Sequence, residues 1–457
     1  MFINLIRTET LKKKSLGIVI LFISILLFVS QALAIDNTFE WVGVDFNFSP
    51  PGARALGMGG AFVSTADDTT APIANPAGTA QLDKMQISLQ YSDGTQNGNS
   101  GSYHYSGVGG PNDIVTVGQT TERGTSSKLS YGSFSTPIFN KALNIALFYS
   151  KTGDIVKNST VSFHNSTNGY AIWPIETNLS IDEYGLSLSK SFFDNKLMFG
   201  AGLSSIHMTL KSSFSESIAG GFATSSDTTY FSDNNNSSNG SGAKVGYRFG
   251  ILYKPLSWLN FGVNGAIMPE YDYKTSYNIT GFLNSLGSLG GAQVISYNFT
   301  NKLKVPDSYS FGVSVRPIQN LLISTEAKYV LYSQLMRDFH VAYDAYTGST
   351  SDPRATYSAS DFKINDIVEY HLGTEYMFNI TKELPLAVRL GTYYVPKHSL
   401  ECTTNQNMKD LGFDGGKNLW HVTGGVGTVI VNHLQLDLAV DLADINNKFI
   451  VSSVYQF

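Results

Sequence analysis

The 457-residue chain has a single cysteine, Cys402, only 15 % charged residues, and eight scattered histidines. One cysteine excludes an intrachain disulfide framework and a cysteine-rich metal site. No histidine stands at zinc-ligand spacing from other ligands, so we predict neither a metal nor another cofactor. The net charge of −5 gives no support for nucleic-acid binding.

Motifs for catalysis are also missing. The glycine-rich "GARALGMGG" has no Lys-Ser/Thr of a phosphate-binding loop and does not follow a buried strand. Asp67 and Asp68 are adjacent carboxylates in a turn-like stretch, and His104 and Ser106 lack a third catalytic partner. We therefore predict that the protein is not an enzyme.

The chain has only one long apolar run, "LGIVILFISILLFV". Three lysines precede it and Gln31-Ala32-Leu33-Ala34 follows, which is the pattern of a secretory signal peptide. The run is shorter than the roughly 20 apolar residues that a spanning helix needs. We predict an exported protein with a signal peptide over residues 1–34, cleaved after Ala34.

Glycine (43), tyrosine (25) and phenylalanine (28) are abundant. Together with low charge and export, they favour an all-β fold of the outer-membrane barrel type, with a large secreted sandwich or β-helix as the alternative. In "HLQLDLAVDLA", Leu436 and Leu438 share one strand face while Asp437 and Asp441 share the other. The stretches "KVGYRFGILYK" and "SYSFGVSVR" alternate in the same way, as lipid-facing and lumen-facing positions do.

Turn spacing supplies the strand count. Tight turns, such as Phe139-Asn140 and Asp194-Asn195, alternate with long Gly/Ser/Asn-rich segments that we interpret as outer loops. The long segments are 93–126, 151–180, 212–242, 271–305, 335–362 and 397–416. This spacing predicts a transmembrane antiparallel barrel of about 14 strands over residues 84–457. The closing "FIVSSVYQF" ends in Phe457, which resembles the recognition signal of the barrel-assembly machinery, an expected partner.

The stretch "GARALGMGGAFVSTADDTTAPIANPAGTA" ahead of these strands resembles the N-terminal segment of the FadL/TodX family of outer-membrane transporters for hydrophobic compounds. Later stretches, including "YRFGILYKPLSWLNFGVNGAIMPEYDY", resemble the family in the same order. The resemblance implies a monomeric barrel in the cell outer membrane, with residues 35–83 folded inside it as a hatch. Asn75, Pro76 and Ala77 match the family's hatch motif, and we group Gly78 with them as gating residues.

The resemblance also implies passive transport. A hydrophobic substrate would enter an apolar groove between the third and fourth outer loops, pass to a pocket at the hatch, and leave sideways into the membrane lipid. The strand count places these loops at 212–242 and 271–305. In the second, one face of a short helix would carry Ile279, Phe282, Leu283 and Leu286. A self-packing loop helix is the alternative.

Four inward-facing basic residues are candidates for holding a substrate carboxylate: Arg248, Arg316, Lys328 and Arg389. Lumenal acids such as Asp437, Glu326 and Glu375 offer another explanation, in which the charges pair with one another. Long-chain fatty acids are the leading substrate class. The alternatives are aromatic hydrocarbons, a non-transporting secretion-associated adaptor barrel, and a general porin, against which the apparent plug argues.

Overall fold

The computed structural model describes residues 46, 48–96, 100–106, 114–121, 125–164, 170–219, 231–282, 293–337, 359–381, 384–404, 409, 414–431, 433–444 and 446–457. The predicted signal peptide and its cleavage site lie outside these residues. Within them, no helix is both long enough and apolar enough to cross a membrane.

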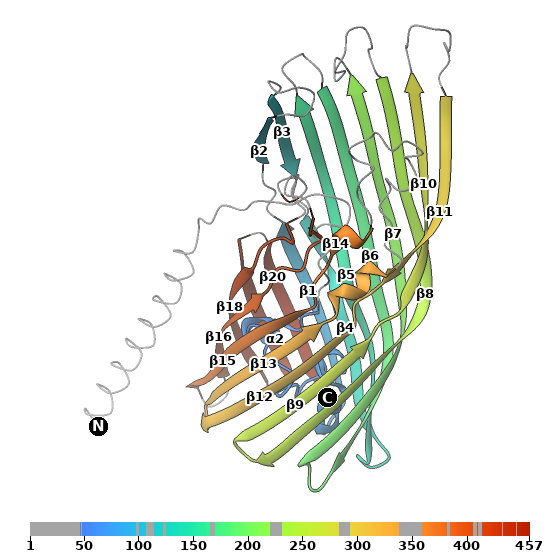
Figure 1. The fold of residues 1–457 in the computed structure, drawn as a ribbon. Coiled ribbons are helices and arrows are strands. Elements are labelled where there is room, and N and C mark those ends of the chain that lie inside the picture. The colour runs from blue at the N-terminus through green and yellow to red at the C-terminus, as the bar shows by residue number, and fades with distance from the viewer. Residues whose placement is uncertain are drawn as a thin grey trace, which may run out of the picture. The chain divides into compact units, whose positions relative to one another are not determined.

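A closed antiparallel β-barrel forms the wall (Figure 1). Its lower courses are β1 (Gln86–Gln96), β4 (Thr125–Ile138), β5 (Leu143–His164), β6 (Tyr170–Phe192), β7 (Leu197–Ala219), β8 (Phe231–Leu256), β9 (Leu259–Ile267), β12 (Ser308–Ile318), β13 (Leu321–Val330), β15 (Ile367–Thr381), β16 (Leu384–Val395), β18 (Leu419–Ile430), β19 (Leu434–Leu442) and β20 (Asn446–Gln456). The pairing of β20 with β1 closes the ring. The predicted count of 14 is confirmed.

Two hairpins extend this wall on the side of the long outer connections. They are β2 (Ser100–Ser106) with β3 (Ile114–Thr121), and β10 (Glu270–Phe282) with β11 (Gln293–Lys304). β3 pairs with the distal part of β5, and β10 pairs with the first part of β8. A small sheet of β14 (Phe362–Lys363) and β17 (Glu401–Cys402) and two 3-10 turns, η2 (Tyr332–Met336) and η5 (Ala359–Asp361), complete this region.

The outer connections are shorter than the sequence suggested. β5 and β6 run through most of 151–180, and β7 and β8 run through most of 212–242. These segments are rich in serine and asparagine because they continue the sheet beyond the lipid, where outward positions face water. The prediction of long loops was wrong for the described residues of both segments, and 165–169 and 220–230 lie outside the described residues.

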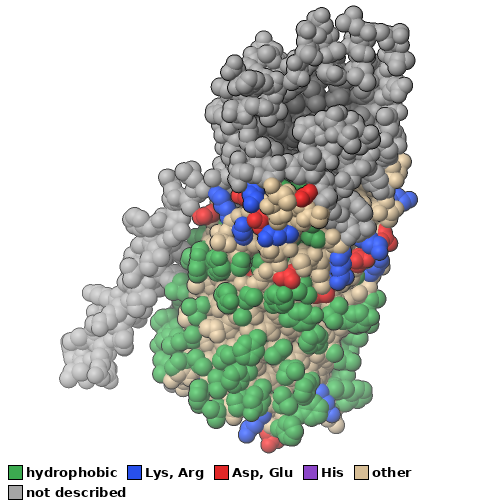
Figure 2. All heavy atoms as spheres, viewed as in Figure 1, with side chains coloured by type: hydrophobic (Ala, Val, Ile, Leu, Met, Phe, Trp, Pro, Cys, Tyr) green, Lys and Arg blue, Asp and Glu red, His purple; other side chains and the backbone are tan. Residues whose placement is uncertain are grey.

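The outer face explains how the barrel sits in a membrane. Leu89, Leu147, Leu203, Tyr247 and Phe311 each keep about half of their surface exposed. Figure 2 shows a broad hydrophobic surface with charged side chains gathered towards its two ends. Such an apolar band is the surface that an outer-membrane barrel presents to lipid.

The N-terminal segment packs inside the ring of strands. It contains α2 (Ala53–Gly57), α3 (Ala71–Ala74) and η1 (Pro76–Gln81), and nearly all of residues 50–79 are buried. Its short helices, turns and glycines give an irregular backbone, which is tolerated at membrane depth only where protein surrounds it. We call residues 35–83 the hatch; its outer boundaries remain predictions.

Candidate functional site

The inner face of the wall changes character above the hatch. On β7, the outward positions pass from Phe199 and Leu203 to His207 and Lys211, whereas the inward positions become Ile206 and Met208. Lumens of outer-membrane barrels are usually polar. This inversion therefore creates an apolar surface inside the part of the barrel that extends beyond the lipid.

A single buried cluster continues that surface around the lumen. Its members come from β5–β7, from the β9–β12 region and from the outer connections; they include Ile155, Leu179, Ile181, Ile206, Met208, Leu210, Met268, Tyr271, Leu303, Val305 and Tyr332. Phe46, near the start of the hatch, belongs to the same cluster, and Phe48 packs against it. An apolar compound entering the barrel from outside would meet this surface before it met the hatch.

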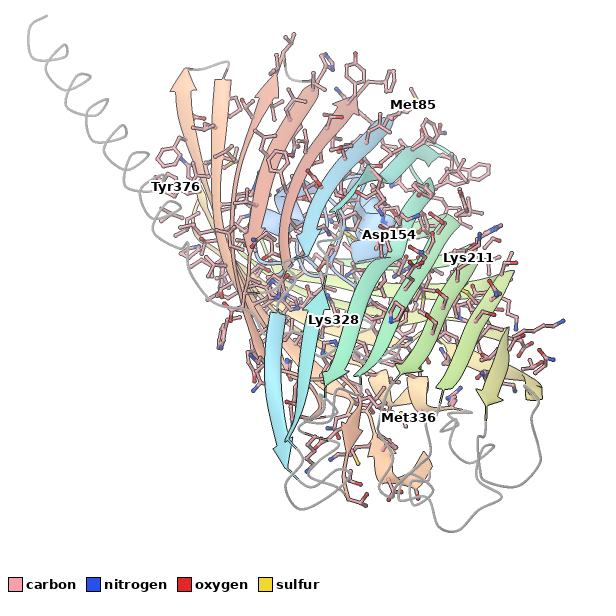
Figure 3. All side chains as sticks on the ribbon, turned by 90° about the horizontal axis from the view of Figure 1, so that it is seen from above. Met85, Asp154, Lys211, Lys328, Met336 and Tyr376 are labelled. Atoms are coloured by element: carbon pink, nitrogen blue, oxygen red, sulfur yellow. The ribbon has the colours of Figure 1, made fainter. Side chains whose placement is uncertain are left out.

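A small polar cavity of about 40 Å³ lies between the hatch and the wall. Pro50 and Ile73 of the hatch border it, together with Ser130, Thr152 and Lys328 of the wall. Figure 3 places Lys328 inside the ring of strands and Tyr376 on its outer side. The cavity is far smaller than the several hundred Å³ of a typical small-molecule site.

Of the four predicted head-group residues, only Arg248 and Lys328 border this cavity. Arg248 binds Glu183 through two hydrogen bonds of 2.8 and 2.7 Å. Lys328 donates to the carbonyl of Phe48 at 2.9 Å and lies 3.7 Å from Glu369.

The other two lie elsewhere. Arg389 binds Glu375 and Asp437, each at 2.7 Å, and borders a recess beside the hatch. Arg316 lies at the end of the barrel that carries the tight turns. Three of the four candidates therefore pair with lumenal acids, as the alternative interpretation expected, and the structure does not bring the four together.

The motif Asn75-Pro76-Ala77-Gly78 lies where the hatch meets the wall. Asn75 is fully buried; its side-chain amide donates to the carbonyls of Val63 at 2.8 Å and of Ile251 at 3.0 Å. Its side-chain oxygen accepts from the Ala77 amide at 3.1 Å, which caps η1. A Cβ on Gly78 would lie 2.0 Å from the carbonyl oxygen of Ala66, so only glycine fits there.

Glycine pairs on adjacent wall strands receive the hatch. Gly200 and Gly250 are direct partners, and a Cβ on either would collide with Asn75, Pro76 or Ala77. Two further directly paired sets do the same: Gly262 with Gly312 opposite Val63, and Gly373 with Gly391 opposite Met58 and Gly59. At these places the hatch backbone lies directly on the strand backbone.

Buried charges add to this attachment. Glu326 accepts the backbone amides of Phe62 and Val63 with one oxygen, both at 3.0 Å. Arg54 of the hatch bonds to Glu375 of β15 at 2.9 and 3.0 Å and pairs with Asp67 at 2.5 Å. Burial alone would lower the pKa of Arg54, but the carboxylates of Asp67, Glu375 and Asp68 outweigh it and raise the pKa well above its usual value.

These contacts were not found from the sequence. Arg54 stands out as the one charge in an otherwise small and apolar stretch, which was a usable indication. Glu326 appeared only as a lumenal acid, and the glycine pairs require the strand register, which one sequence does not supply.

The wall between β4 and β5 is incomplete on the side facing the apolar cluster. These strands pair from Ile138↔Leu143 up to Tyr131↔Ser150, and no further pairing joins them within the described residues. Ser130 is an extra residue in the β1–β4 ladder, and Thr152 is an extra residue in the β5–β6 ladder. Such bulges bend a strand and end its pairing. Lys128 and Asp154 form an ion pair between the separated strands.

Apolar side chains surround a groove of about 930 Å³ on the outer surface beside this break. It is lined by Leu89, Leu129, Phe134, Leu147, Tyr149, Tyr184 and Leu203, among others. Gly132 also lines it and carries no side chain to fill it, whereas at Gly185 the Phe148 ring occupies the place of a side chain. The inner cavity reaches Ser130 and Ser150, which are next to the groove residues Leu129 and Tyr149 in the chain.

The predicted loop helix is wrong over Ile279 to Phe282. β10 runs through Ile279 to Phe282 and pairs with β8 and β11, so this part is strand. A strand does not place residues three apart on one face, and the proposed shared face is lost. Leu283 and Leu286 lie outside the described residues. Among those described, no group of three or more His, Cys, Asp or Glu side chains is arranged to hold a metal.

The sequence profile of the family described as "Outer membrane protein transport protein (OMPP1/FadL/TodX)" matches residues 46–407. The chain belongs to this family. The resemblance seen in the sequence is thereby confirmed, and the protein is an outer-membrane transporter of hydrophobic compounds.

Solved structures of FadL/TodX-type barrels share the fold at low identity. A Pseudomonas aeruginosa FadL homologue is 14 % identical, with a TM-score of 0.59 over 91 % of this chain and 100 % of that one. The Pseudomonas putida toluene transporter TodX is 14 % identical (TM-score 0.58; 90 % and 99 % covered), and the Ralstonia pickettii toluene transporter TbuX is 13 % identical (TM-score 0.54; 90 % and 99 % covered). No curated protein sequence matches the chain.

Proposed function

We propose that this transporter carries long-chain fatty acids or similar amphiphiles passively, from the apolar lumenal cluster sideways through the break between β4 and β5 into the membrane. The apolar lining of the outer lumen supports an aliphatic substrate. The single observation that carries the exit route is the end of β4–β5 pairing, with a cavity on its inner side and an apolar groove on its outer side.

Energetics favour this route over release into water. A long chain gains about 0.8 kcal/mol per buried methylene, so passage from lumen to lipid keeps a gain that aqueous release would lose. The hatch forms the floor of the lumen, where Asn75, Pro76, Ala77 and Gly78 fix it to the wall. It thereby closes the way straight through the barrel and leaves the sideways exit. The inner cavity would have to enlarge as substrate passes, with the Lys128–Asp154 ion pair opening.

A cross-link tests the exit directly. Lys128→Cys with Asp154→Cys, joined by a short bis-maleimide, would hold β4 and β5 together, and uptake of a labelled fatty acid should fall. The matched control is Thr136→Cys with Ile145→Cys, which are direct partners lower on the same two strands and do not line the groove. Equal uptake by both cross-linked proteins would remove the β4–β5 break from the route. The natural Cys402 is buried and should not react.

Aromatic hydrocarbons are the second candidate, favoured by one observation. Arg248, Lys328 and Arg389 already have carboxylate partners, which leaves no free lumenal cation for a fatty-acid head group among the three. Two of the similar structures are of toluene transporters. In the fatty-acid proposal, Arg248 and Lys328 must exchange their partners for the substrate carboxylate.

Equilibrium binding of a labelled long-chain fatty acid to the detergent-folded barrel, with toluene as competitor, separates the candidates. Saturable binding that toluene does not displace supports fatty acids, and displacement supports hydrocarbons. No binding of either favours the secretion-associated adaptor, which the small inner cavity would also suit. We further expect no enzymatic activity, a monomer, contact with outer-membrane lipid, and recognition of Phe457 by the assembly machinery.

A further inference from the structure

A polar recess of about 280 Å³ lies at the end of the barrel where the tight turns are, which is the periplasmic end in outer-membrane barrels. The turns after β6 and β8 form one side of it, and Arg316 of β12 forms another. Thr65, Asp67 and Gln81 of the hatch complete it. The recess is several times larger than the roughly 30 Å³ that a water molecule occupies in the liquid.

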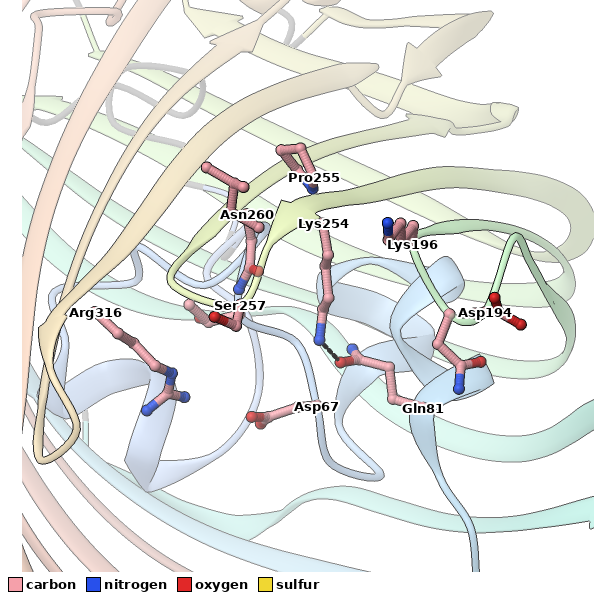
Figure 4. A pocket seen from close by; sticks show the side chains of 12 residues that line it. Asp67, Gln81, Asp194, Lys196, Lys254, Pro255, Ser257, Asn260 and Arg316 are labelled. Carbon is pink, nitrogen blue, oxygen red and sulfur yellow. Dashed lines mark hydrogen bonds between the residues drawn. The ribbon is translucent and has the colours of Figure 1, made fainter.

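Three basic side chains line this recess: Lys196, Lys254 and Arg316. Figure 4 shows Lys254 and Arg316 directed into the same space, with Asp67 between them. Lys254 donates to the side-chain oxygen of Gln81, which is a neutral acceptor.

Their charges are not neutralised as the lumenal charges are. Arg54, Arg248, Lys328 and Arg389 each have a carboxylate within 4 Å. Within the described part of the chain, none of the three basic residues of the recess forms such a pair.

The two acids of the recess, Asp67 and Asp194, offset only part of this charge, because they face three basic residues. Asp67 pairs with Arg54 at 2.5 Å, which it shares with Asp68 and Glu375, and Asp194 lies on an exposed turn. The recess therefore keeps an excess of positive charge, together with the neutral polar groups of Thr65, Ser257 and Asn260.

We propose that this recess binds a phosphate group from the periplasmic side. The planar guanidinium of Arg316 suits two phosphate oxygens, and Lys254 supplies a point charge that can leave Gln81 for the ligand. An apolar chain would find little to contact there. The site is thus separate from the apolar transport route, and it contacts the hatch directly through Asp67 and Gln81.

The phosphate could belong to a soluble ion or to the head group of a phospholipid from the periplasmic leaflet. Calorimetric titration of the full, detergent-folded barrel with inorganic phosphate, and separately with dihexanoyl-phosphatidylglycerol below its micelle concentration, distinguishes these sources. Binding of inorganic phosphate indicates a soluble ligand. Binding of the phospholipid alone indicates a head group.

Arg316→Gln and Lys254→Gln should each weaken that binding about tenfold or more, because each removes one charge-assisted contact. Lys141→Gln is the matched control, since Lys141 is an exposed lysine on another periplasmic turn and lies outside the recess. The proposal is overturned if neither ligand binds saturably. It is also overturned if all three variants bind like the unaltered protein, which would indicate diffuse surface charge. Heat-modifiable migration on gels verifies that every variant has folded.

Discussion

Gly250→Ala should loosen the hatch without disturbing the barrel. The new Cβ would lie 2.0 Å from the side-chain oxygen of Asn75 and 2.8 Å from Cδ of Pro76, where ordinary contacts begin at 3.4 Å. The hatch motif must therefore move by more than about 1 Å. The strand itself has little reason to change, because alanine is accepted at a lumen-facing position of a paired strand.

The cost can be worked out from the contacts. Overpacking of this kind costs about 1–3 kcal/mol. Displacing Asn75 also weakens its two hydrogen bonds, to Val63 and Ile251, at about 1 kcal/mol each. The docking of the hatch against β7 and β8 should thus weaken by about 3–5 kcal/mol.

Conductance in planar bilayers measures this loosening, since a displaced hatch lets ions pass. We expect frequent openings for Gly250→Ala. Gly202→Ala is the matched control, because Gly202 lies on neighbouring β7 and a Cβ there would meet nothing closer than 3.5 Å. If Gly250→Ala prevents assembly, Gly200→Ala replaces it, with Pro76 at 2.2 Å from the new Cβ. Folded variants that remain as closed as the control would refute the docking argument.

Three further results are expected. Asn75→Ala with Pro76→Ala should assemble normally but lower hydrophobic uptake, measured with labelled fatty acid in cells; normal uptake would count against a role for the motif. Glu326→Ala should expose the hatch to added protease more than Glu326→Gln, since alanine leaves two buried amides without an acceptor at about 1–3 kcal/mol each. Burial raises the pKa of Asp68, and the charge of Arg54 offsets this rise only in part. Protection of the hatch against protease should therefore decline as the pH rises through that raised pKa. Asp68→Asn should remove the decline, and a variant with an unchanged pH profile would contradict this assignment.

The membrane-facing part of the fold was predictable because one physical rule governs it. In β8, β12 and β19, lipid requires apolar side chains at every second position, and the sequence shows this alternation without knowledge of any partner strand. The turn at Phe139-Asn140 was visible through Asn140, because the backbone there has a positive φ, which asparagine tolerates.

The extended strands and the site were less predictable. Above the lipid, β7 is apolar inside and polar outside, the reverse of its lower half, so a single alternation rule fails there. The pairing of Arg248 with Glu183 joins residues 65 positions apart, and the glycine pairs meet only through the register of neighbouring strands. Both depend on three-dimensional contacts that residue spacing does not encode.

Locking the hatch in place is the most direct test of sideways exit. The side-chain oxygens of Thr69 in the hatch and Ser135 in β4 lie 2.8 Å apart, so Thr69→Cys with Ser135→Cys should form a disulfide that ties the hatch to the wall. Uptake of labelled long-chain fatty acid is then measured with the disulfide formed and after its reduction. Equal uptake in both states is expected if substrate leaves between β4 and β5. Uptake lost on oxidation and restored by reductant would contradict the account, because it would mean that the hatch itself must move out of the way.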